Sequence, residues 1–226
     1  MTLEKLIYDV RESMKDYVDD STVDDRYIMY LINNKRSKLV GQDLDRQNTT
    51  IDEGMKQNFC IGLERVSAVQ CGMDLGCEYV YRTNKGIPEP MDLKNSPAII
   101  RVSSTNLLDK PYSLTSRERA AYHSDSPFNT IPVAFYHNDG YIYLTGQDNA
   151  LKLLNKINIT GVFENPLDLM EYTTETGQAC FDFDTFNYPI PTKYIEVITG
   201  EVVRILAGAK MMPEDTTNNG QEDGNK

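Results

Sequence analysis

The chain offers few side chains of the kinds that enzymes use as nucleophiles or general bases. It has two histidines, His123 and His137, and four cysteines among its 226 residues. A serine or cysteine nucleophile needs a base held beside it, and no Gly-x-Ser-x-Gly segment or similar motif pairs either histidine with one. His137 falls in a predicted hairpin turn, where exposure to solvent is expected. We therefore predict that the chain has no catalytic residues and is not an enzyme.

Metal and phosphate chemistry also lack a convincing motif. Zinc ligands usually come in pairs about two to four residues apart, whereas Cys71 and Cys77 have five residues between them and no second pair. Five aspartates lie between Asp16 and Asp25, but without the spacing of a calcium loop. No P-loop is present. We expect no metal or cofactor, and read the acidic segment as helix capping plus a solvated turn. A cation site there is the alternative.

Composition restricts the partners. The formal net charge is −11, and tight nucleic-acid binding depends on lysine and arginine contacts to phosphate, so sequence-specific DNA binding is not expected. An acidic wall could still let DNA slide past without sticking. No run of about eighteen apolar residues predicts a membrane span, the first residues do not resemble a secretion signal, and the cysteines are expected to be reduced thiols.

Periodicity predicts helices at both ends of the sequence. Apolar residues three and four apart between Leu3 and Tyr17 form one stripe, and a second helix is expected from about Ser21 or Thr22, either of which could cap it. A last helix is predicted from about Thr192. The polar segment 213–226 has no aliphatic or aromatic side chain, so we expect it to be disordered.

The sequence predicts strands in the middle of the chain. Candidates are 78–83, 99–102, 131–136, 141–144 and 156–163, and the clearest hairpin signal is the Asp139-Gly140 pair. Asn165-Pro166 predicts a capped helix start. The expected class is α+β, with a helical pair (1–50), a mainly antiparallel β region (51–164), a C-terminal helical region (165–212) and a tail (213–226), forming one structural unit.

Two features suggest contacts between subunits. Lys35, Arg36 and Lys38 form a basic patch within about one helical turn. In a ring this patch could meet the acidic turn of the next copy, which runs from Asp16 to Asp25; Asp24, Asp25 and the adjacent Arg26 are predicted interface residues. In a single subunit, the same residues could be separate solvated faces. Phe181 and Phe183 alternate with aspartates like an edge strand or docking loop, or they could pack on the core of their own subunit.

The chain resembles the neck ring proteins of crAss-like tailed phages. The resemblance is carried by residues 19–28, DDSTVDDRYI, running on to Lys35-Arg36, by Arg82-Thr83 with Ile87-Pro88, and by residues 161–166, GVFENP. It covers most of the chain from residue 2 to about 210, and the motifs are structural, not catalytic.

The resemblance implies a structural virion protein. Proteins of this kind stack as dodecameric rings beneath the portal protein, extend the channel through which genomic DNA is packaged and ejected, and offer the tail or adjacent ring proteins a docking surface. The resemblance implies no catalytic residue in this chain. The alternatives are another phage assembly or baseplate component and, less favoured, a metal-dependent enzyme.

Overall fold

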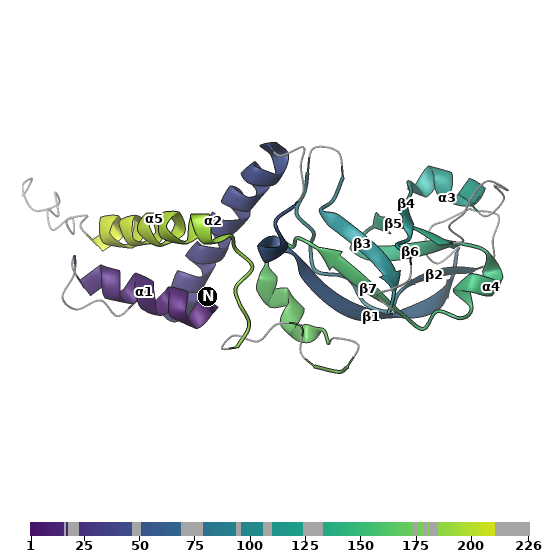
Figure 1. Ribbon diagram of the computed structural model, residues 1–226, viewed down its shortest axis with the longest axis horizontal. Coiled ribbons are helices and arrows are strands. Elements are labelled where there is room, and N and C mark those ends of the chain that lie inside the picture. Colours follow the sequence, from purple (N-terminus) through teal and green to yellow (C-terminus); the bar gives the residue numbers. More distant parts are fainter. Residues whose placement is uncertain are drawn as a thin grey trace, which may run out of the picture.

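The fold is described by a computed structural model, which places residues 1–15, 17, 23–46, 51–68, 79–93, 96–105, 110–123, 133–173, 176–178, 180 and 185–210. Three long helices gather at one end of an elongated molecule, and a curved sheet occupies the other (Figure 1). The predicted combination of helices and a mainly antiparallel sheet is confirmed. The predicted disordered tail, 213–226, lies outside the described residues.

The helical end combines the two ends of the described chain. Helix α1 spans Leu3–Lys15, α2 spans Asp25–Arg46 and α5 spans Thr192–Lys210. The stripe predicted for α1 is buried from Leu3 to Met14, whereas Tyr17, its last predicted member, is exposed and lies beyond the end of the helix. Helix α5 packs on both N-terminal helices. The apolar residues of α5 that enter the core are Ile198, Val202, Val203 and Leu206. A single buried cluster runs from these helices into the sheet, so hydrophobic burial stabilises the two ends of the molecule together.

Local hydrogen bonds explain where α2 begins and how the chain's start is held. The carboxylate of Asp24 accepts a bond from the backbone N–H of Arg26 at 3.0 Å, which caps α2. Ser21 and Thr22, the predicted caps, lie outside the described residues. The N-terminal ammonium of Met1 donates to the Asn187 side chain at 2.7 Å, and the N–H of Tyr188 donates to the Met1 carbonyl at 2.9 Å. The start of α1 is thereby tied to the segment that leads into α5.

Seven strands form the sheet in the order β3-β7-β1-β2-β6-β5-β4. All neighbouring pairs are antiparallel except β4 with β5. The strands are β1 (Gln57–Ser67), β2 (Tyr79–Thr83), β3 (Ile99–Ser104), β4 (Ser113–Leu114), β5 (Val133–Asn138), β6 (Tyr141–Gly146) and β7 (Lys156–Gly161). Short helices complete the described fold: η1 (Glu53–Met55), α3 (Arg117–His123), α4 (Asp148–Leu151) and η2 (Pro166–Glu171).

Strand β1 joins the two halves of the sheet. Its first part, from Gln57 to Gly62, pairs with β7, and its second part, from Leu63 to Ser67, pairs with β2. Gly62 marks the change of partner, where a Cβ atom would lie 2.9 Å from the Asn84 amide nitrogen. One edge also approaches the other, because the N–H of Tyr112, next to β4, donates to the carbonyl of Val102 in β3 at 2.7 Å. The sheet therefore curls around its buried face.

The hairpin between β5 and β6 is tighter than predicted. Its turn consists of Asp139 (φ 50°) and Gly140 (φ 75°), and the ladder continues to the pair Asn138 and Tyr141. Positive φ at both central residues is the requirement of a type I′ turn. The prediction that His137 lies exposed in the turn is wrong, because the strand extends through it and the side chain is half-buried. The predicted start at Asn165 is confirmed, although η2 is a 3-10 helix.

A substitution at Gly161, the last residue of β7, tests how closely the end of this strand packs against Ala98 and Phe163. A Cβ atom there would lie 2.9 Å from the Ala98 carbonyl oxygen and 3.0 Å from the Phe163 ring. We expect Gly161→Ala to lower the free energy of unfolding by about 1–3 kcal/mol, measured by chemical denaturation. Gly41→Ala in α2 is the control, since no heavy atom lies within 4 Å of its Cβ position; it should raise stability by up to about 1 kcal/mol. Equal effects of the two changes would contradict the packing argument.

Candidate functional site

The polar face of α2 docks on the junction between helices and sheet. Asn33, Arg36 and Ser37 are spaced to share one side of the helix. The Asn33 amide donates to the Asn165 side chain at 3.0 Å, and the Ser37 hydroxyl donates to the Glu164 carbonyl at 2.8 Å. This side of α2 therefore binds the segment that follows β7.

Arg36 is the centre of that junction. Its side chain is 0% exposed, and its guanidinium donates to three carbonyls: Pro189 at 2.8 Å, Phe163 at 2.8 Å and Glu164 at 3.2 Å. It also lies 5.8 Å from the centre of the Tyr188 ring. Burial lowers the pKa of Arg36 and raises the pKa of Tyr188 to about 12. The Tyr188 hydroxyl donates to Asn33 at 2.9 Å, which closes the network.

The predicted basic patch is wrong with respect to Arg36, because a buried guanidinium cannot meet a neighbouring subunit. Lys35 forms an ion pair at 2.7 Å with Glu201 of α5, which lowers the pKa of that carboxyl. Lys38 is exposed. The interface role of Lys35 and Lys38 stays a prediction.

The predicted acidic partner is only partly described. Asp25 forms an ion pair at 2.6 Å with Arg11 of α1, Asp24 caps α2, and Arg26 is exposed. The structure thus engages two of the predicted interface acids within the subunit. Phe181 and Phe183, like Asp16, Asp19 and Asp20, lie outside the described residues.

Within the described residues, no group of three or more His, Cys, Asp or Glu side chains could hold a metal ion. Burial lowers the pKa of His137 and raises the pKa of Cys180 to about 11, which disfavours the reactive thiolate. The side chain of His123 lies outside the described residues. None of the described helices combines the length and the apolar composition needed to cross a bilayer.

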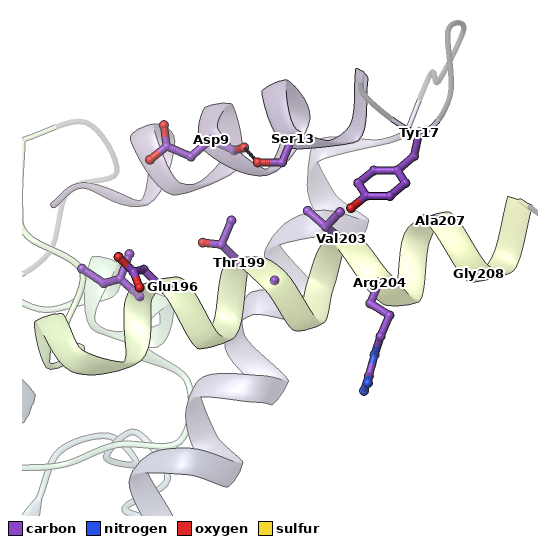
Figure 2. Close-up of a pocket in the computed structure, with 11 residues that line it drawn as sticks. Asp9, Ser13, Tyr17, Glu196, Thr199, Val203, Arg204, Ala207 and Gly208 are labelled. Atoms are coloured by element: carbon purple, nitrogen blue, oxygen red, sulfur yellow. Dashed lines mark hydrogen bonds between the residues drawn. The ribbon is translucent and has the colours of Figure 1, made fainter.

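A groove between α1 and α5 is a concave surface that the sequence analysis did not predict. Its volume is about 860 Å³, and it opens on the side away from α2 (Figure 2). Its floor and walls are mainly small or apolar, and Tyr17, 57% exposed, stands at one end. The lining residues are Asp9, Ser13, Tyr17, Ile195, Glu196, Thr199, Gly200, Val203, Arg204, Ala207 and Gly208. The available signal was the small residues Gly200, Ala207 and Gly208 inside a predicted helix.

Comparison with known proteins identifies the family. Residues 5–224 match the family described as "Phage tail ring protein 2". The chain belongs to this family. It is also 26% identical over 226 residues to "Ring protein 2" of Bacteroides phage crAss001, covering 99% of this chain and 98% of that protein. The resemblance to crAss-like ring proteins seen in the sequence is confirmed. A ring protein works by association, so the contact surfaces of each subunit are its functional sites. The groove between α1 and α5 is a candidate contact surface.

The Arg36 junction gives the first test at this site. Arg36→Leu removes all three hydrogen bonds and takes the Arg36 donor from the Phe163 and Pro189 carbonyls, whereas the Glu164 carbonyl keeps its bond from Ser37. The change should cost about 3–5 kcal/mol of unfolding free energy. Urea denaturation followed by circular dichroism measures this loss. Lys38→Leu, at an exposed position of the same helix, should change stability by no more than about 0.5 kcal/mol. A similarly small effect of both changes would show that Arg36 is dispensable for the fold.

His137 gives a test by pH. Desolvation disfavours its charged form, and Asp92 and Asp139 oppose this only in part, so its pKa in the folded chain lies below the ordinary 6.5. The unfolded chain therefore takes up the proton first, and the stability contributed by neutral His137 is present above about pH 6.5 and lost as the pH falls through that value. His137→Gln should flatten the stability curve between about pH 7 and 5. Parallel curves for both proteins would contradict the assignment.

Burial and nearby acids raise the pKa values of Glu164 and Asp168. Their effect on stability as the pH falls is therefore opposite to that of His137. A carboxyl with a raised pKa gains relative stability as the pH falls. The difference between the parent chain and the His137→Gln variant isolates the histidine, because both chains retain these carboxyls.

Proposed function

We propose that about twelve copies of this chain form a closed ring in the phage neck, between the portal protein and the tail. The ring extends the channel for genome packaging and ejection and gives tail or adjacent ring proteins a docking surface. The observation that supports this most directly is the match to a tail ring protein family over residues 5–224. The protein is then a virion component that is assembled in the cytoplasm of the bacterial host.

The charge of the chain suits a DNA channel. At −11 per copy, twelve copies would carry a formal charge of roughly −132. Such a ring disfavours the counterion-releasing contacts that hold DNA tightly, so the duplex passes without sequence-specific binding. The proposal needs no catalysis, metal or cofactor.

Charged contacts between neighbouring subunits remain part of the proposal. Arg26 and Lys38 are exposed on α2, so each is available to an acidic neighbour. Exposed ion pairs contribute only about 0–1 kcal/mol each. Charge pairing alone would therefore set the register of the ring more than its stability, and a stable ring needs apolar contact as well.

Electron microscopy of the purified particle tests the proposal. The density at the neck should be averaged under trial rotational symmetries, and we expect it to contain this chain as a closed ring of about twelve subunits below the portal. Mass spectrometry of the same particles should detect the chain. A neck without the chain would refute the proposal. It would favour an assembly factor, a baseplate component, or a metal-dependent enzyme with its metal site in the Asp16–Asp25 segment.

A further inference from the structure

The groove between α1 and α5 contains glycines that the subunit itself does not require. Gly200 and Gly208 lie within α5, where glycine is less favourable than alanine. A Cβ atom at either position would meet no heavy atom within 4 Å. Packing among the described residues of the subunit therefore does not explain these two glycines. Because glycine has no side chain, nothing projects from α5 at these two positions, and another chain can approach the helix backbone closely.

We infer that the groove receives an element of the neighbouring copy: the turn of residues 152–155 that follows α4, led by Leu153. This inference rests on the proposed ring. Leu153 is 82% exposed, the highest value among the exposed large hydrophobic side chains of the described chain. An aliphatic side chain this exposed gains most by entering an apolar groove in a partner.

The positions of the two surfaces fit a cyclic assembly. A ring closes through a heterologous contact, in which one patch of each copy meets a different patch of the next. Helix α4 lies at the far end of the molecule from α1 and α5 (Figure 1), so the turn and the groove are two separate patches of one subunit, as a heterologous contact requires.

The charges around the two surfaces are complementary. Asp9 of α1 and Glu196 of α5 lie at the same end of the groove, whereas Arg204 points away from α1 (Figure 2). The turn carries exposed Lys152 and is followed by exposed Lys156. With Leu153 in the groove, these lysines can face the two carboxylates, and opposite charges fix which end of the groove the turn enters.

Cross-linking inside assembled particles tests the contact directly. Phage lacking its own copy of the gene would be supplied with the full chain carrying both Leu153→Cys and Gly200→Cys, and the virions would be treated with a short bismaleimide. We expect a ladder of cross-linked oligomers of this chain, absent from each single variant. The matched control pairs Leu153→Cys with Gly41→Cys, because Gly41 also lies in a helix with open space around its Cβ position but outside the groove; it should give no ladder.

Blocking the groove gives the second measurement. Gly200→Leu should reduce incorporation of the chain into particles at least tenfold while leaving the thermal unfolding midpoint of the purified chain unchanged or higher. Gly41→Leu should incorporate normally. Exchanging charges should behave similarly: Lys152→Glu with Lys156→Glu should lose incorporation, and adding Asp9→Lys with Glu196→Lys should restore it.

The outcomes separate this inference from the proposed ring. A neck ring seen by microscopy without the Leu153–Gly200 ladder would overturn the contact and leave the ring standing. Cross-links from Gly200→Cys to the portal or to another ring protein would also overturn it, by assigning the groove to a different partner. Virions without any ring of this chain would refute both proposals.

Discussion

The buried guanidinium of Arg36 connects parts of the chain that have no covalent reason to meet. Its three acceptors belong to the segment after β7 and to the segment before α5, while Arg36 itself lies on α2. A charged group in this position is stable only when hydrogen bonds replace its lost hydration. Buried carbonyls need donors of this kind: Arg36 supplies them to Phe163 and Pro189, and it shares the Glu164 carbonyl with the Ser37 hydroxyl. The helices and the sheet are therefore oriented by a polar contact, and hydrophobic burial around it supplies most of the stabilisation.

Two further links reinforce the same junction. Met1 bonds to Asn187 and Tyr188, so the start of α1 is held against the segment that precedes α5. On the sheet side, Phe59 of β1 packs on the rings of Phe163 and Tyr172, with ring centres 5.5 and 4.6 Å away. Aromatic packing thus links β1 to the segment after β7, which contacts Arg36.

The surface divides between groups used within the subunit and groups left for partners. Asp25 and Lys35 are each paired inside the chain, whereas the α1–α5 groove and Leu153 have no covering element among the described residues. The net charge of −11 opposes non-specific association between copies. Specific apolar contacts can then form where shape and charge agree.

The sequence by itself determined the elements that depend on near neighbours. The spacing of Leu3, Leu6 and Ile7 predicts the buried stripe of α1, Asp139-Gly140 predicts the turn, and Asn165-Pro166 predicts the start of η2; these depend on backbone conformations within a few residues. The string of residues around 19–28 was enough to suggest the family. The position of the β-hairpin strands was predicted to within two residues at each end.

Only the tertiary structure decided which polar residues are buried. Arg36 has the same local pattern as Lys35 and Lys38, and only the approach of the Phe163 and Pro189 carbonyls, more than 120 residues away, makes it internal. The change of partner along β1 and the α1–α5 groove also depend on such distant contacts. Hydrophobic periodicity reports which face of a helix avoids water, but it does not report when a polar face meets backbone carbonyls. That pairing depends on the whole fold.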